Sequence, residues 1–207
     1  NGSDERNIGS YRKKKRKEVV DKMTEIENVD QTVSATEKMV AENAGTMVPP
    51  AEREGKYLTF TMAEKDYGMG ILKIKEIIGM QDITPVPRTP DFVKGVINLR
   101  GKVIPVVDLR LRFSMDDTEY NERTCIIVVE VAGKTGMVQI GIVVDSVSEV
   151  MNIKNEDIED TPTFGTKLDT DYILGMAKME GGVKILLDID SVLSSEEIKG
   201  LERIDDR

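Results

Sequence analysis

An internal repeat is the feature that most constrains the fold of this chain. Residues 91–109 align with residues 171–189 at an offset of 80, so that Gly95, Gly101 and Asp108 coincide with Gly175, Gly181 and Asp188. A weaker match at an offset of 73 aligns residues 68–77 with residues 141–150, with Gly68 on Gly141. Because the two matches follow in the same order, we expect one β-rich unit that occurs twice.

Each copy of the repeat predicts a β-hairpin. Residues 95–110 read GVINLRGKVIPVVDLR, two runs rich in Val, Ile and Leu joined by the corner Asn98-Leu99-Arg100-Gly101. Gly101 allows the positive φ that a tight reversal requires. The corner of the second copy is Glu180-Gly181-Gly182, so the Arg of the first corner is replaced by Glu.

Short strand-like segments predominate from residue 56 onward. Residues 57–62 alternate between apolar and polar, and the apolar run 124–131 is followed by a turn and a returning run at 137–144. Residues 71–78 have isoleucines at helical spacing, yet Ile is β-branched, so a short helical turn and a kinked strand both remain open. Ser194, followed by two acids, predicts the start of a terminal helix. These patterns indicate small β units that share an apolar seam.

Composition excludes several classes of function. The chain has no His, which removes His-based acid–base catalysis and a phospho-accepting His, and its one cysteine, Cys125, allows no Cys-based zinc site. A net charge of −9 and the absence of Trp argue against a general nucleic-acid binder. No apolar run is long enough for a transmembrane helix, and we expect a cytoplasmic location.

Neither nucleotide nor calcium binding is indicated by a complete motif. Gly133-Lys134-Thr135 matches the end of a P-loop, but the first Gly of that motif would fall on Val128. Residues 155–160 are acidic but lack the central Gly of a calcium loop. An enzyme built on paired carboxylates, such as a glycosidase, is the remaining alternative, although aromatic residues make up only 4% of the chain. We expect no catalytic residue, no metal and no cofactor.

Residues 1–55 differ from the rest and are expected to form a flexible N-terminal extension. They open with a basic run at residues 12–17, which is typical of a solvated tail because like charges repel one another. The alternative is that this run contacts an anionic membrane, a nucleic acid or a protein partner. Residues 199–207 are expected to form a short C-terminal tail.

The sequence of the first hairpin closely resembles the CheW-like domain family of bacterial chemotaxis. The resemblance covers roughly residues 56–198, through YGMGILKIKEI and TPDFVKGV before the hairpin and GIVVDSVSEV, DYILGMAKM and ILLDID after it. It implies an all-β fold of two five-stranded SH3-like β-barrel subdomains packed on a shared apolar core, with short helices that include one near the C-terminus.

The resemblance also implies a non-enzymatic adaptor. Members of this family couple the cytoplasmic tips of methyl-accepting chemotaxis receptors to the regulatory domain of the histidine kinase CheA. The implied protein is a monomer in solution that assembles into receptor arrays, without nucleic acid or membrane insertion. The alternative is a CheW-like scaffold of another chemosensory or two-component system, in which the basic extension makes a separate membrane or partner contact.

Four residues match positions that the family uses for binding. Arg100 matches a position important for coupling to both receptor and kinase, and Glu76 matches a position of receptor contact. Ile74 and Ile126 match apolar positions of the same receptor groove, and a role in the core is the alternative for both. A helical receptor tip that docks on a β surface requires apolar anchors and one or two charges that set its register.

Overall fold

The computed structural model describes residues 53–133, 136–161 and 171–193. The chain divides into two compact units, residues 1–52 and 53–207, and every described residue belongs to the second unit. The basic run at 12–17 and the expected helix at Ser194 therefore lie outside the described residues.

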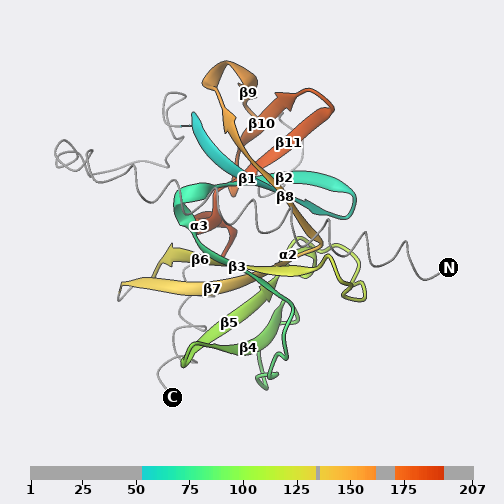
Figure 1. Cartoon of the computed structure of the whole chain (residues 1–207), viewed down its shortest axis with the longest axis vertical. Helices are drawn as coiled ribbons and strands as arrows, with labels where there is room; N and C mark the ends of the chain where they lie inside the picture. Colours follow the sequence, from blue (N-terminus) through green and yellow to red (C-terminus); the bar gives the residue numbers. More distant parts are fainter. Residues whose placement is uncertain (1–52, 134–135, 162–170, 194–207) are drawn as a thin grey trace, which may run out of the picture. The chain divides into compact units, whose positions relative to one another are not determined.

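The described residues form two sheets joined by short helical turns (Figure 1). The first sheet has the order β8 (Ser146–Ile153), β1 (Gly55–Met62), β2 (Lys65–Gly70), β11 (Gly182–Leu187), β10 (Ile173–Met179), β9 (Ile158–Glu159). The second has the order β3 (Ile74–Gly79), β6 (Cys125–Ala132), β7 (Met137–Val144), β5 (Lys102–Asp108), β4 (Val93–Leu99). The helical turns are η3 (Ile71–Lys73), α2 (Leu109–Arg112), η4 (Asn155–Asp157) and α3 (Ile189–Val192). The all-β prediction is confirmed.

Several elements of the structure recur at the offset of the sequence repeat. An offset of 80 carries β4 onto β10 and α2 onto α3 with identical bounds, 93–99 onto 173–179 and 109–112 onto 189–192. The parallel pairs also correspond, since Val106 lies opposite Gly141 in one sheet and Leu186 lies opposite Gly68 in the other. The glycines that align in the sequence thus occupy equivalent places in the fold.

The chain crosses between the two sheets twice. β2 belongs to the first sheet, but β3, which follows it through η3, pairs with β6 in the second sheet. β7 belongs to the second sheet, but β8, which follows it through Asp145, pairs with β1 in the first sheet. Each sheet therefore contains strands from both copies of the repeat.

Both sheets curl, so that elements at opposite ends of the strand order approach each other. In the second sheet, Thr84, which follows β3, forms an isolated bridge with Val96 of β4. Gly95 makes this approach possible: its φ is +139°, and a Cβ placed there would lie 2.1 Å from the carbonyl oxygen of Thr84. In the first sheet, the two-residue β9 takes the place of this bridge, which is why that sheet has six strands rather than the expected five.

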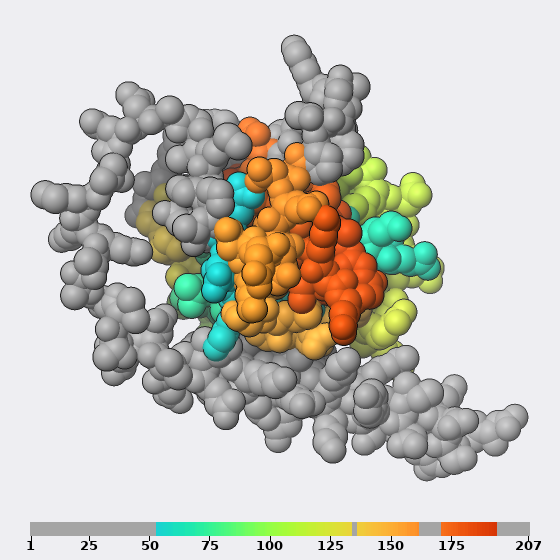
Figure 2. Space-filling view, turned by 90° about the horizontal axis from the view of Figure 1, so that it is seen from above, coloured from blue at the N-terminus to red at the C-terminus, as the bar shows by residue number. Residues whose placement is uncertain are grey.

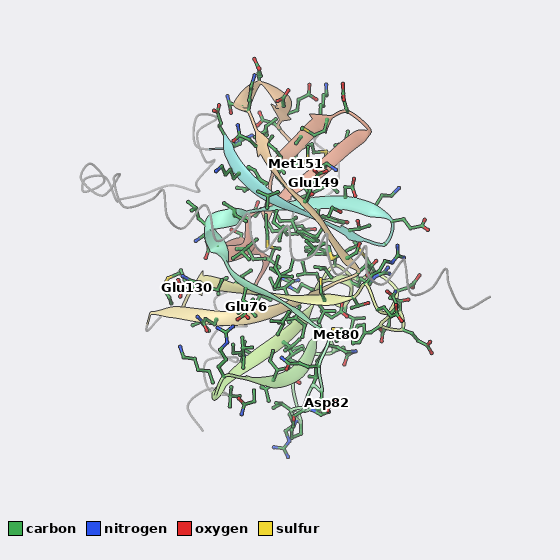
Figure 3. All side chains as sticks on the ribbon, in the orientation of Figure 1. Glu76, Met80, Asp82, Glu130, Glu149 and Met151 are labelled. Atoms are coloured by element: carbon green, nitrogen blue, oxygen red, sulfur yellow. The ribbon has the colours of Figure 1, made fainter. Side chains whose placement is uncertain are left out.

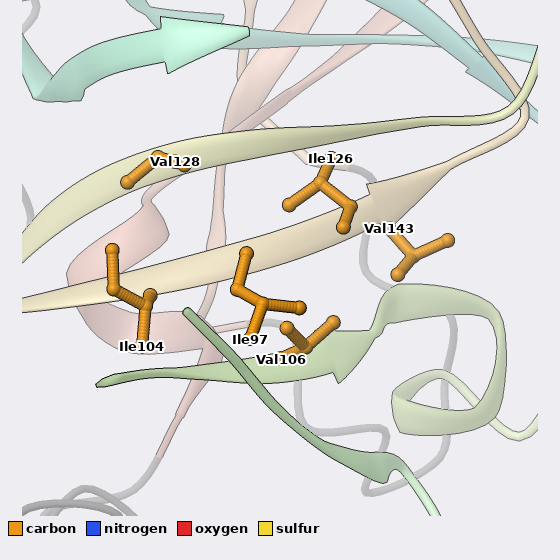
Figure 4. Packing of buried hydrophobic residues seen from close by; sticks show 6 residues of the cluster. All are labelled: Ile97, Ile104, Val106, Ile126, Val128 and Val143. Carbon is orange, nitrogen blue, oxygen red and sulfur yellow. The ribbon is translucent and has the colours of Figure 1, made fainter. Parts of the chain in front are cut away.

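The strands β1 and β6 are buried on both faces. In β6, Ile126 and Val128 point into a cluster within the second sheet, together with residues of β4, β5 and β7 (Figure 4). The residues that alternate with them along β6, Ile127 and Val129, are equally buried although they do not belong to that cluster. Alternate residues of a strand face opposite sides, so this second set forms the apolar seam with the first sheet. On the outer side of the first sheet, the surface is formed mainly by β8 to β11 (Figure 2).

Two segments refine the expectations from the sequence. Residues 71–78 contain both structures that their pattern allows, because η3 is followed directly by β3. Residues 53–55 are not part of a flexible extension, since Gly55 begins β1 and Arg53 is only 8% exposed. Arg53 forms an ion pair with Asp160 at 2.5 Å, and its carbonyl oxygen accepts a hydrogen bond from the hydroxyl of Tyr57, so the chain is anchored before the first strand.

Candidate functional site: an exposed charged corner

The corner between β4 and β5 is a two-residue turn that projects Arg100 outward. Leu99 pairs with Lys102, and both residues between them have positive φ, +53° for Arg100 and +87° for Gly101. Positive φ at both central positions is the requirement of a type I′ hairpin turn. The side-chain oxygen of Asn98 accepts a hydrogen bond from the backbone N–H of Gly101 at 2.9 Å and stabilises the turn. The Arg100 side chain is 78% exposed.

Arg100 and Glu76 form an ion pair, with Nη2 of Arg100 at 2.6 Å from Oε1 of Glu76. They meet although β3 and β4 lie at opposite ends of the strand order, because the sheet curls. Glu76 of β3 is 28% exposed, and Glu130 of β6 is labelled near it in Figure 3. Lys75, beside Glu76 in the chain, pairs with Glu130 at 2.8 Å. We call Arg100 and Glu76 together the charged corner.

The second copy of the repeat cannot build this ion pair. Glu149 occupies the position of Glu76 at the offset of 73, and Glu180 occupies the position of Arg100 at the offset of 80. Both are carboxylates, and both are exposed. The charged corner is therefore specific to the first copy, which agrees with a function that only one of the two copies serves.

The two apolar positions, Ile74 and Ile126, are buried in this conformation. Ile74 is 6% exposed, and Ile126 is fully buried in the cluster of the second sheet. Their expected role in receptor contact stays a prediction. In the geometry observed, both side chains lie in the interior and do not present a surface of their own.

Asp108 is a buried carboxylate at the end of β5. It is 2% exposed, and one of its oxygens accepts hydrogen bonds from the backbone N–H groups of Arg110 and Leu111, which caps α2. Its other oxygen accepts a hydrogen bond from the hydroxyl of Tyr120 at 3.0 Å. The pKa of Tyr120 is raised well above its ordinary value of 10.0. Burial is the largest cause, and the charge of Asp108 is the second.

This shift in the pKa of Tyr120 predicts a loss of stability in alkali. The folded protein holds the Tyr120 proton more tightly than the unfolded chain does. The contribution of this difference to the free energy of unfolding is therefore fully present below about pH 10 and is lost as pH rises further. Urea unfolding across this range is expected to show a steeper loss for the native chain than for Tyr120→Phe. Identical pH profiles for the two proteins would contradict this account.

Sequence reasoning missed a column of four stacked aromatic rings. The rings belong to Phe60, Tyr67, Phe113 and Tyr172, with successive centroids 5.8, 6.4 and 4.9 Å apart. The column joins the first sheet to Phe113, the residue that follows α2. No local pattern could have revealed it, because its members come from four separate segments.

The described residues contain no helix that is long and apolar enough to span a membrane. Within the same residues, no group of three or more potential side-chain ligands could hold a metal ion. Charged groups at an interface fix the register of the two partners, so the charged corner suits a protein-interaction module.

Comparisons with known proteins identify the module. The model of the CheW-like domain matches residues 56–197. The chemotaxis protein CheW of Klebsiella aerogenes is 40% identical over 149 residues, which cover 72% of this chain and 87% of that protein. CheW of Thermotoga maritima is 33% identical over 152 residues, which cover 72% and 94%.

A solved structure agrees with these relatives. The scaffolding protein TtCheW from Thermoanaerobacter tengcongensis aligns with a TM-score of 0.61 and 35% identity, over 70% of this chain and 97% of that one. The chain belongs to the CheW-like domain family, a family of chemotaxis scaffold proteins.

Proposed function

We propose that this protein is a non-enzymatic adaptor that couples the cytoplasmic tips of chemoreceptors to the regulatory domain of the histidine kinase CheA. Membership in the CheW-like family supports the proposal, since its named relatives are chemotaxis and scaffolding proteins. The curling of both sheets supports the further expectation that the two subdomains are SH3-like barrels. The proposed place of action is the cytoplasm.

The observation that carries the proposal is the charged corner. Arg100 lies on a two-residue turn that the hydrogen bond to Asn98 stabilises, and Glu76 lies on a strand at the opposite end of the same sheet. An exposed ion pair contributes little to folding, about 0–1 kcal/mol, so stability alone gives little reason for this arrangement. A preorganised pair of opposite charges suits recognition of a helical receptor tip, where charges fix the register.

We assign the roles as follows. Glu76 and Arg100 provide charges for receptor contact, and Arg100 also takes part in the contact with the kinase. Ile74 and Ile126 contribute to the receptor site by supporting β3 and β6.

Arg100→Ala is expected to weaken binding to a receptor-tip fragment about tenfold, because truncation of a central arginine typically costs more than about 1 kcal/mol. Its free energy of unfolding should change by less than about 0.5 kcal/mol, since the side chain is exposed. Titration calorimetry and urea unfolding measure the two quantities.

Lys178→Ala is the matched control. Lys178 lies close to the corner of the second copy and forms a similarly exposed ion pair with Glu159 at 2.5 Å. The Lys178→Ala variant should bind the receptor-tip fragment with the affinity of the native chain. Equal losses for the two variants would show that a nonspecific change of charge, and not the charged corner, governs binding.

A further inference from the structure

Each crossover between the sheets is held by an ion pair with a short helix. At the crossover from β2 to β3, Nζ of Lys73 lies 2.5 Å from Oδ2 of Asp190 in α3. The other oxygen of Asp190 accepts a hydrogen bond from the backbone N–H of Ala132, at the end of β6, at 3.0 Å. Asp190 therefore joins three segments: α3, η3 and β6.

The crossover from β7 to β8 has an equivalent arrangement. Nε and Nη2 of Arg110 in α2 donate to the two oxygens of Asp145 at 2.7 and 2.5 Å. Oδ2 of Asp145 also accepts a hydrogen bond from the backbone N–H of Ala63, just after β1, at 2.9 Å. Asp145 thus joins α2, the crossover and the end of β1.

The two arrangements correspond through the internal repeat, with the charges reversed. Arg110 and Asp190 occupy the same position of α2 and α3 at the offset of 80. The helix carries the cation at one crossover and the anion at the other. At both crossovers a carboxylate binds a cation and also accepts a hydrogen bond from a backbone N–H. That N–H lies at the end of β6 at one crossover and just after β1 at the other. The same network is thus built twice from different residues.

We propose that Asp190 is a positioning residue for the charged corner, an inference that rests on the proposed function. Lys73 is the last residue of η3, and β3, which carries Glu76, begins at the next residue. By holding Lys73 against α3 and β6, Asp190 fixes where β3 starts and therefore where Glu76 meets Arg100. The β7 to β8 crossover has no such effect, because β8 enters the other sheet.

Lys73 and Asp190 are 40% and 28% exposed, so the ion pair is partly screened and the fold does not depend on it. Loss of the pair should act on the local freedom of β3 and leave the global unfolding transition nearly unchanged. This difference separates a positioning role from a merely structural one.

The test uses the chain of residues 1–207 with Asp190→Asn, which keeps an acceptor for the Ala132 N–H and removes the charge. Amide hydrogen exchange in residues 74–79 is expected to become about threefold faster, and affinity for a receptor-tip fragment is expected to fall about threefold. Asp66→Asn is the control, because it removes another ion pair, that with Lys184 at 2.8 Å, away from β3. It should change neither quantity.

The double variant K73D/D190R provides the rescue. It rebuilds this crossover with the polarity of the other one, an Asp at the crossover and an Arg on the helix, and it should restore both slow exchange and affinity. Unchanged exchange in Asp190→Asn, or weaker binding without faster exchange, would overturn the proposal. If the native chain binds no receptor fragment, the proposed function fails, and the exchange measurement still decides whether Asp190 positions β3.

Discussion

Gly95→Ala is expected to lower the free energy of unfolding by about 3 kcal/mol or more, because the added methyl group has no space beside the backbone of Thr84. A Cβ at this position would lie 2.1 Å from the carbonyl oxygen of Thr84, and the φ of +139° is one that L-residues rarely adopt. The clash is with backbone, which cannot rotate away as a side chain can. The Thr84–Val96 bridge would have to break, and the curl of the second sheet would be lost with it. Urea unfolding monitored by circular dichroism measures the effect.

Gly101→Ala is the matched control for this prediction. Gly101 also has a positive φ, +87°, but a Cβ there would meet nothing within 4 Å. The expected loss is about 1–2 kcal/mol, from backbone strain alone. Similar losses at positions 95 and 101 would show that strain, and not the approach of Thr84, makes Gly95 necessary.

Ile126→Ala is expected to cost about 3 kcal/mol of unfolding free energy, within the range of about 2–5 that buried Ile truncations show. The side chain is fully buried and packs in the cluster of Figure 4, and its Cγ2 would lie 2.8 Å from a Cβ at Gly141. The space it leaves cannot be filled by the small neighbour at Gly141. Leu72→Ala, at a side chain that is 75% exposed, is the comparison and should change stability by less than about 0.5 kcal/mol.

The same variant decides how Ile126 contributes to receptor binding. If Ile126 supports the sheet, Ile126→Ala should unfold at lower urea, and the folded fraction should retain most of its affinity for a receptor-tip fragment. If instead Ile126 contacts the receptor directly, affinity should fall steeply while stability is nearly unchanged. The second outcome would require β6 to open on binding.

The repeat made much of the fold predictable. Glycines and aspartates that recur at one offset indicate positions where the backbone conformation is constrained. Gly95 and Gly175 have positive φ and no space for a Cβ, and Asp108 and Asp188 cap the two short helices. The type I′ turn at Arg100 was predictable for the same reason, since Gly101 supplies one of its two positive φ values.

The exchange of strands between the sheets was not predictable from pattern. Alternation indicates a strand with one buried face and an unbroken apolar run indicates a strand with two, but neither pattern shows which sheet accepts the strand. The Arg100–Glu76 ion pair depends on that exchange, because it brings β3 into the sheet of β4. The crossover ion pairs escaped prediction for a related reason: Lys73 and Asp190 lie 117 positions apart, and nothing local marks either as a partner.

The most direct test of the adaptor role is whether one chain binds both partners at once. A receptor-tip fragment, the regulatory domain of CheA and this protein should be mixed and their masses determined by size exclusion with light scattering. The proposed function predicts a complex of all three that forms only when this protein is present, and that Arg100→Ala weakens. Displacement of one partner by the other, or binding of neither, would contradict it.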